Sequence, residues 1–170
     1  MKSRKVSKDI LIKLLVDNCA AVNIGPAEFA RIFNLLIKES NCSIICADGN
    51  KTKTSGLLDA RIFDGTKTHG LKIQLLEDCQ DWLLSFPELN DMGFQIWGDL
   101  DSDKSFLVCP NKLVWPLKRE SDGVWSIVLR VIVDDDGNVT LEVADEVEYC
   151  LRSAPVLERI DTGESHRKRP

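Results

Sequence analysis

The sequence predicts an α+β fold with an N-terminal helical hairpin, a mostly antiparallel sheet, and one further helix between two groups of strands. Three observations indicate this class. Apolar residues recur at helical spacing between residues 8 and 37, they alternate in several later segments, and short polar turns join the alternating segments. Strands joined by short turns do not form the strand–helix–strand repeat of a parallel sheet.

Two helices are predicted at the N-terminus. Ser7 can cap a helix that begins near Lys8, because its hydroxyl can accept a hydrogen bond from a free backbone N–H. Pro26 suits the first turn of a second helix, since its missing N–H would have no partner there. The apolar stripes would consist of Ile10, Leu11, Leu14, Leu15, Cys19 and Val22 in the first helix, and of Phe29, Ile32, Phe33, Leu36 and Ile37 in the second. The break between the helices is short, so an antiparallel hairpin is expected.

Alternation and helical spacing then predict the remaining elements in order. The predicted strands are residues 43–47, 57–63, 71–75, 94–97, 105–109, 111–117, 124–133 and 139–143. A helix is predicted over residues 75–86, where Pro87 would end it. Apolar residues on both faces of residues 124–133 indicate a central strand. Pro116 indicates an edge strand for residues 111–117, because it lacks a backbone donor.

The 170 residues match the size of one domain, and the net charge of −5 is mildly acidic. The total charge therefore gives no reason to expect general affinity for nucleic acid or anionic membranes. Charged residues interrupt the apolar part of the N-terminus, so we expect a cytoplasmic protein whose six cysteines form no disulfides. We expect a basic arm at residues 1–7, a single α+β domain at residues 8–152, and a poorly ordered tail at residues 153–170.

Charge is more segregated than the total shows. Residues 73–103 and residues 131–151 contain acidic residues but no lysine or arginine. Several bases lie in the first meander: Lys51, Lys53, Arg61, Lys67 and Lys72. Other bases lie in the arm and the tail, where they could contact nucleic acid: Lys2, Arg4, Lys5, Arg167, Lys168 and Arg169. The two halves of the chain are therefore expected to carry opposite potentials.

One cysteine pair has a spacing near that of a zinc site. Cys42 and Cys46, together with His69 and Cys79, could supply zinc ligands. The spacing is one residue longer than the commonest zinc knuckle, and no second pair follows. Buried thiols are the preferred interpretation.

A metal-dependent nuclease would need an acid on one strand and an acid-x-lysine motif on the next. Asp59 or Asp64 could be the first acid and Lys72 the lysine, but Gly70 occupies the position of the second acid. We therefore predict no catalytic residues, no metal ligands and no cofactor.

Asp99, Asp101 and Asp103 alternate, so on a strand they would share a face and could hold Mg²⁺ or Ca²⁺. The segments on either side alternate as strands, which favours a hairpin with residues 101–104 at its tip.

Two tryptophans lie beside these acids or in the predicted edge strand. An exposed tryptophan among carboxylates is a common kind of interface anchor. The predicted partner-binding surface consists of Trp97, Asp99, Asp101, Asp103 and Trp115. The alternative is that a helix covers the tryptophans.

These observations favour a non-catalytic protein–protein interaction subunit or adaptor of a larger intracellular complex, with a partner that presents a basic surface. One alternative is an acidic inhibitor or immunity-type protein that occupies a basic enzyme surface. Another is an accessory subunit that contacts nucleic acid through its basic arm and tail. No membrane association is expected.

Overall fold

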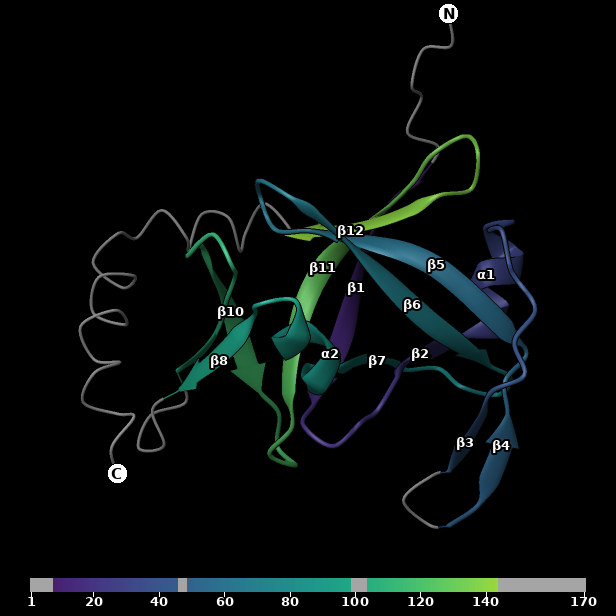
Figure 1. Ribbon diagram of the computed structural model, residues 1–170, viewed down its shortest axis with the longest axis horizontal. Helices are drawn as coiled ribbons and strands as arrows, with labels where there is room; N and C mark the ends of the chain where they lie inside the picture. The colour runs from purple at the N-terminus through teal and green to yellow at the C-terminus, as the bar shows by residue number, and fades with distance from the viewer. Residues whose placement is uncertain (1–7, 46–48, 99–103, 144–170) are drawn as a thin grey trace, which may run out of the picture.

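The computed structural model describes residues 8–45, 49–98 and 104–143 (Figure 1). These residues are mostly β, with 54% strand and 10% helix, so the predicted α+β class is wrong. The strands are β1 (Lys8–Asp17), β2 (Asn23–Pro26), β3 (Ser43–Ile45), β4 (Lys51–Lys53), β5 (Gly56–Phe63), β6 (Thr68–Leu76), β7 (Trp82–Ser85), β8 (Gln95–Gly98), β9 (Ser105–Val108), β10 (Val114–Arg119), β11 (Trp125–Val133) and β12 (Val139–Val143). The helices are α1 (Ala27–Ile32) and α2 (Phe86–Asp91).

Seven strands close into a barrel in the order β1, β7, β2, β6, β5, β12, β11. β1 closes the barrel by pairing antiparallel with β11, from Lys8 opposite Val133 to Val16 opposite Trp125. On its other edge β1 pairs parallel with β7. β2 with β6 and β5 with β12 are also parallel pairs, whereas the other barrel pairs are antiparallel.

The sheet continues beyond the barrel through β10, β9 and β8. Residues 129–133 of β11 pair with β12, while Trp125 and Ser126 pair with β10. β1 pairs along the other edge of β11, so β11 is a central strand, as its apolar faces predicted. The edge strand expected at residues 111–117 is instead an inner strand, β10. Pro116 is tolerated there because β10 pairs with β11 only at Lys118 and Arg119.

The predicted N-terminal helical hairpin is wrong. The first predicted helix is strand β1, in which Ile12, Leu14 and Val16 point to the core and Leu11 is exposed. The apolar residues of this segment fit the spacing of a helix and also that of a strand. Pairing with β11 and β7 makes the segment a strand. The second predicted helix is shortened to α1, because Asn34 adopts a left-handed conformation with φ of 52° after the helix ends.

The helix predicted over residues 75–86 is also wrong. Its sequence divides between the end of β6 and strand β7. Helix α2 begins where the predicted helix would end, because the Ser85 hydroxyl accepts a hydrogen bond from the Glu88 backbone N–H and Pro87 lies in the first turn.

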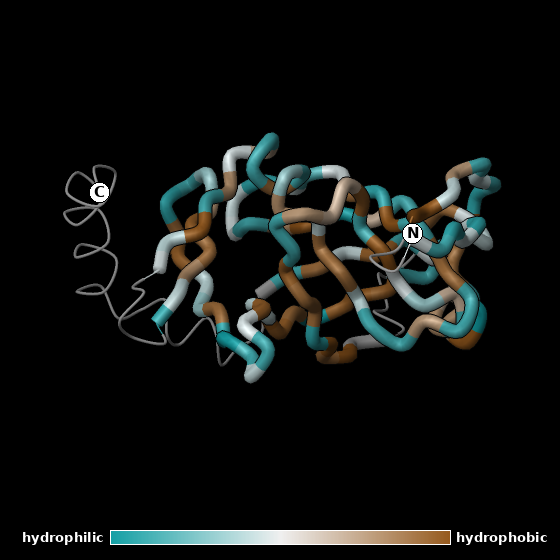
Figure 2. Tube along the Cα trace, turned by 90° about the horizontal axis from the view of Figure 1, so that it is seen from below, coloured by the Kyte–Doolittle hydropathy of each residue, from teal (hydrophilic) through white to brown (hydrophobic). Residues whose placement is uncertain are grey.

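One apolar core fills the barrel and extends under β8–β10. Figure 2 shows hydrophobic segments running through the middle of the molecule, with hydrophilic residues gathered in the peripheral turns. Several of the largest side chains are fully buried: Trp115, Phe94, Leu14, Leu58, Ile62, Leu71, Ile73, Leu75, Leu84, Leu89, Leu107 and Ile127. Trp82 packs edge-on against Phe29 of α1, with 4.9 Å between ring centroids, and joins the helix to this core.

We expect Gly25→Ala to destabilise the fold and Gly70→Ala to leave it intact. A Cβ at Gly25 would lie 2.7 Å from the Trp82 ring, and overpacking of this kind costs about 1–3 kcal/mol. A Cβ at Gly70 would meet nothing within 4 Å. Urea unfolding followed by tryptophan fluorescence measures both variants, and equal stabilities would contradict the close approach of β2 to Trp82.

Candidate functional site

The predicted partner surface is divided between the core and a part of the chain outside the described residues. Trp97 is partly buried on β8, and with Phe106 it packs against Val108. Trp115 is 0% exposed and lies near the Phe94 ring, with 5.8 Å between centroids. Its side chain is therefore not available to a partner in this fold.

β8 and β9 pair antiparallel, from Gln95 opposite Val108 to Gly98 opposite Ser105, as the hairpin interpretation predicts. Residues 99–103, which lie between these two strands in the sequence and include Asp99, Asp101 and Asp103, are outside the described residues. The basic arm, the tail and their candidate nucleic-acid contacts also lie outside them: Lys2, Arg4, Lys5, Arg167, Lys168 and Arg169.

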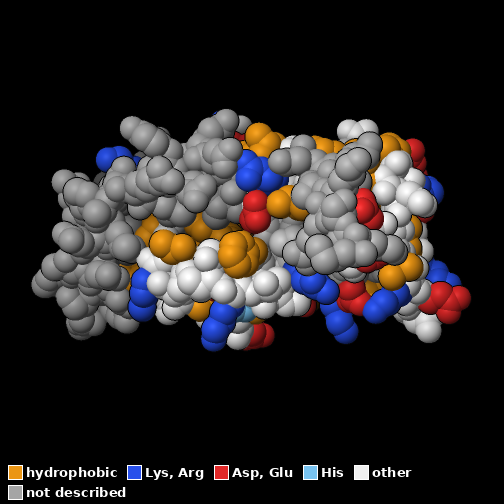
Figure 3. Space-filling model, turned by 90° about the horizontal axis from the view of Figure 1, so that it is seen from above, with side chains coloured by type: hydrophobic (Ala, Val, Ile, Leu, Met, Phe, Trp, Pro, Cys, Tyr) orange, Lys and Arg blue, Asp and Glu red, His pale blue; other side chains and the backbone are white. Residues whose placement is uncertain are grey.

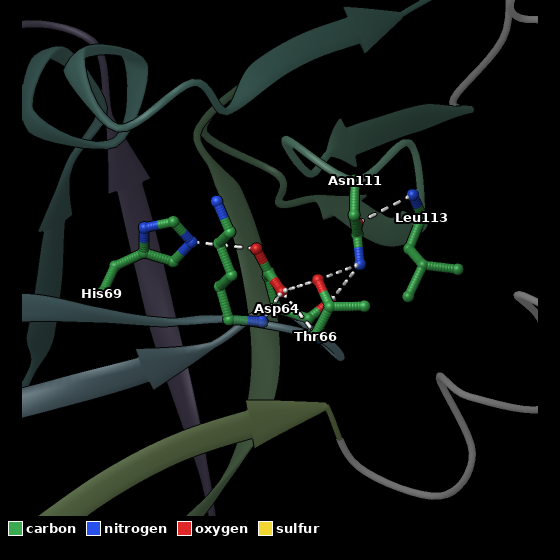
Figure 4. A network of polar contacts seen from close by, with 6 residues as sticks. Asp64, Thr66, His69, Asn111 and Leu113 are labelled. Atoms are coloured by element: carbon green, nitrogen blue, oxygen red, sulfur yellow. Dashed lines mark hydrogen bonds and ion pairs between the residues drawn. The ribbon is translucent and has the colours of Figure 1, made fainter.

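A buried polar joint centred on Asp64 connects the barrel to the β8–β10 extension (Figure 4). Asp64 lies in the β5–β6 turn, where one carboxylate oxygen accepts hydrogen bonds from the backbone N–H groups of Thr66 and Lys67 at 2.8 and 2.7 Å. The other oxygen accepts a hydrogen bond from His69 Nε2 at 2.9 Å. Asn111, in the β9–β10 loop, donates to the Asp64 backbone carbonyl at 3.1 Å. The turn and the loop are thereby held together.

Burial alone would raise the pKa of Asp64, but hydrogen bonds from His69, Lys67 and Thr66 outweigh it and lower the pKa to about 2. The carboxylate is 1% exposed, and both of its oxygens are engaged by these donors. It is therefore arranged to hold the turn, not to exchange protons with a substrate.

Cys109 lies close to this joint and is 2% exposed. Burial, reinforced by the Asp64 charge, raises the pKa of its thiol far above the ordinary range. The thiol form dominates, so Cys109 is a packing residue and not an activated nucleophile.

The described cysteines Cys19, Cys42, Cys79 and Cys109 are free thiols, and Cys46 of the suggested zinc set lies outside the described residues. Across residues 8–45, 49–98 and 104–143, no group of three or more histidine, cysteine or acidic residues could hold a metal ion. No helix in the same ranges is long and apolar enough to cross a membrane.

A second feature is a groove on the outer face of the barrel, which we call the β5–β6 groove. Its floor is set by strand alternation and register. Asp59 lies opposite Lys72, and Arg61 lies opposite Gly70, and all four positions are exposed. Because Gly70 has no side chain, the floor is open between Arg61 and Lys72.

Two connections form the walls of this groove. Leu36 and Lys38 come from the α1–β3 connection, which is fixed to β5 by two backbone hydrogen bonds of 2.8 Å between Lys38 and Leu57. Gly137 and Asn138 come from the β11–β12 turn. The space enclosed is about 390 Å³.

The groove carries three basic side chains and one acidic one. Lys38 forms an ion pair with Asp59. Within the described part of the chain, the side chains of Arg61 and Lys72 form no ion pair. The surface there is therefore positive, although the whole chain is acidic.

A larger and shallower hollow, about 660 Å³, lies at the β10–β11 turn. Charged side chains in this hollow already interact with neighbouring side chains. Glu120 pairs with Lys13 at 2.6 Å and with Lys118 at 3.7 Å, and Arg119 lies over the Trp125 ring. The β5–β6 groove is the better candidate for a charged partner, because two of its cations are not engaged in this way.

Most of the described exposed apolar side chains come from one segment of the chain, and Leu36 of that segment lines the groove. Among the residues that the structure describes, five large hydrophobic side chains are exposed, and four of them lie between residues 32 and 45: Ile32, Leu36, Ile37 and Ile45. Ile32 is 66% and Leu36 62% exposed. In Figure 3, which shows one face of the molecule, hydrophobic side chains reach the surface in several places beside basic ones.

Comparison with known proteins finds no matching family model, no matching curated protein and no matching solved structure.

We expect Asp64→Asn to lower the free energy of unfolding by about 2 kcal/mol at neutral pH, from the shift of the pKa from 3.8 to about 2. The folded-state pKa is lowered, so this stabilisation is present above pH 4 and is lost as the pH falls toward 2. Urea unfolding between these pH values measures it, and the dependence should be weaker in the variant. Asp59→Asn is the control, since an exposed ion pair contributes at most about 1 kcal/mol.

Proposed function

We propose that this chain is a non-catalytic subunit that binds another protein. The observation that carries the proposal is the positively charged groove with the exposed Leu36 at its edge, in a chain segment, residues 32–45, that holds four exposed large apolar side chains. Isolated surface hydrophobics need no explanation, but a cluster bordered by charged residues is typical of protein-binding surfaces. The groove and the exposed apolar side chains of residues 32–45 together combine apolar contact with a charge that selects the partner.

The polar joint supports the same proposal. Asp64 and His69 have the residue types of an acid–base pair, but the Asp64 carboxylate is occupied by hydrogen bonds around the β5–β6 turn, and its backbone carbonyl accepts from Asn111 of the β9–β10 loop. The predicted acidic surface around Asp99, Asp101 and Asp103 remains a separate proposal, with a basic partner, since those residues lie outside the described ranges.

The double variant Ile32→Gln/Leu36→Gln tests the proposal. Both side chains are exposed, so the fold should be retained, while partner binding should weaken at least about ten-fold if they are anchors. The measurement is affinity purification from the native host with quantified recovery of each co-purifying protein, followed by binding titration of the recovered partner.

Leu11→Gln is the matched control, because Leu11 is 49% exposed on β1 and lies in a different segment. A partner that binds the control but not the double variant supports the proposal. Recovery of no specific partner, or equal recovery with both variants, contradicts it.

A further inference from the structure

We infer that the β5–β6 groove binds a short acidic segment of the partner protein, with an apolar side chain of that segment resting on Leu36 at the edge of the groove. This inference rests on the proposed function and names the chemistry of the partner. It also reverses the sign expected from the sequence, where an acidic surface of this chain was predicted to meet a basic partner.

The charge arrangement favours carboxylates. Arg61 presents a planar guanidinium that can bind a carboxylate through two hydrogen bonds. Lys72, two residues beyond Gly70 on β6, presents a second cation on the same face. Since Gly70 leaves the space between them open, a carboxylate can approach both.

The fold limits how such a segment can bind. β6 pairs with β5 and β2, and β5 pairs with β6 on one edge and with β12 and Lys38 on the other. The edges near the groove are occupied, so an added strand cannot form backbone hydrogen bonds there. Recognition must come from side chains that lie across the sheet face.

The surroundings favour a peptide over a nucleic acid. None of the described residues lining the groove is aromatic, so bases would have nothing to stack on. A chain of net charge −5 repels a long polyanion more than a short acidic segment. Leu36, at the wall, offers a contact to an aliphatic side chain that a phosphate backbone cannot use.

Fluorescence anisotropy with labelled probes tests the inference. The first probe is a short peptide of glutamates ending in leucines, and the second replaces the leucines by serines. We expect the leucine peptide to bind more tightly, and its affinity to fall with increasing salt. A single-stranded DNA oligonucleotide and phosphatidylserine vesicles are the competing probes.

Variants of the groove should change this binding in both directions. Gly70→Glu and Arg61→Gln should each weaken the leucine peptide at least about ten-fold, whereas Asp59→Asn should strengthen it by a few-fold. Lys118→Gln is the matched control, because it also changes the net charge by one unit and lies on the exposed end of β10. Circular dichroism and urea unfolding verify that each variant is folded.

The outcomes separate this inference from the proposed function. Loss of peptide binding in the groove variants but not in Lys118→Gln supports the inference. Peptide binding that is absent or insensitive to groove variants, or tighter binding of DNA or vesicles through the same residues, overturns it. If the recovered partner still depends on Ile32 and Leu36 but not on Arg61 or Gly70, the inference fails while the proposed function stands. If no partner is recovered, the proposed function fails as well.

Discussion

The antiparallel pairing of β1 with β11 is the constraint on which the rest of the structure depends. This pairing places Lys8 opposite Val133 and closes seven strands into a barrel. Closure removes the free edges of these strands and forces their alternating side chains to divide between one core and one outer surface. β11 then serves both the barrel and the β8–β10 extension, because its two halves pair with different strands. The outer face of β5 and β6 is therefore a surface of side chains supported by the closed, hydrogen-bonded sheet.

The same pairing explains which elements could be predicted from the sequence. β5, β6, β11 and β12 lie in hairpins whose alternation and turns are local, so their positions were predicted correctly. β1 pairs with residues more than a hundred positions away, and its apolar residues satisfy a helical period equally well. β7 likewise depends on β1 and β2 for its pairing. Helices were predicted in both places because local spacing does not show a distant strand edge.

The candidate site could also be predicted only in part from the sequence. Arg61, Gly70 and Lys72 could have been placed on one face from the hairpin register alone, since strands were predicted at residues 57–63 and 71–75. The walls of the groove could not have been predicted from the sequence. Lys38 reaches β5 through an isolated bridge, and Gly137 belongs to a turn far along the chain. Trp115 was placed on an edge strand because of Pro116, and only the pairing of β10 with both neighbours shows that it is buried.

A positive groove on an acidic chain has a physical consequence for recognition. The net charge of −5 repels an acidic partner at long range, while Arg61 and Lys72 attract it only at short range. Association is therefore not accelerated by steering over a distance, and the lifetime of the complex depends on contacts made in the groove. Such a site discriminates against long polyanions and favours a short acidic segment whose apolar side chain reaches Leu36. The negative net charge of the whole chain and the positive charge of the groove together therefore determine which partners are selected.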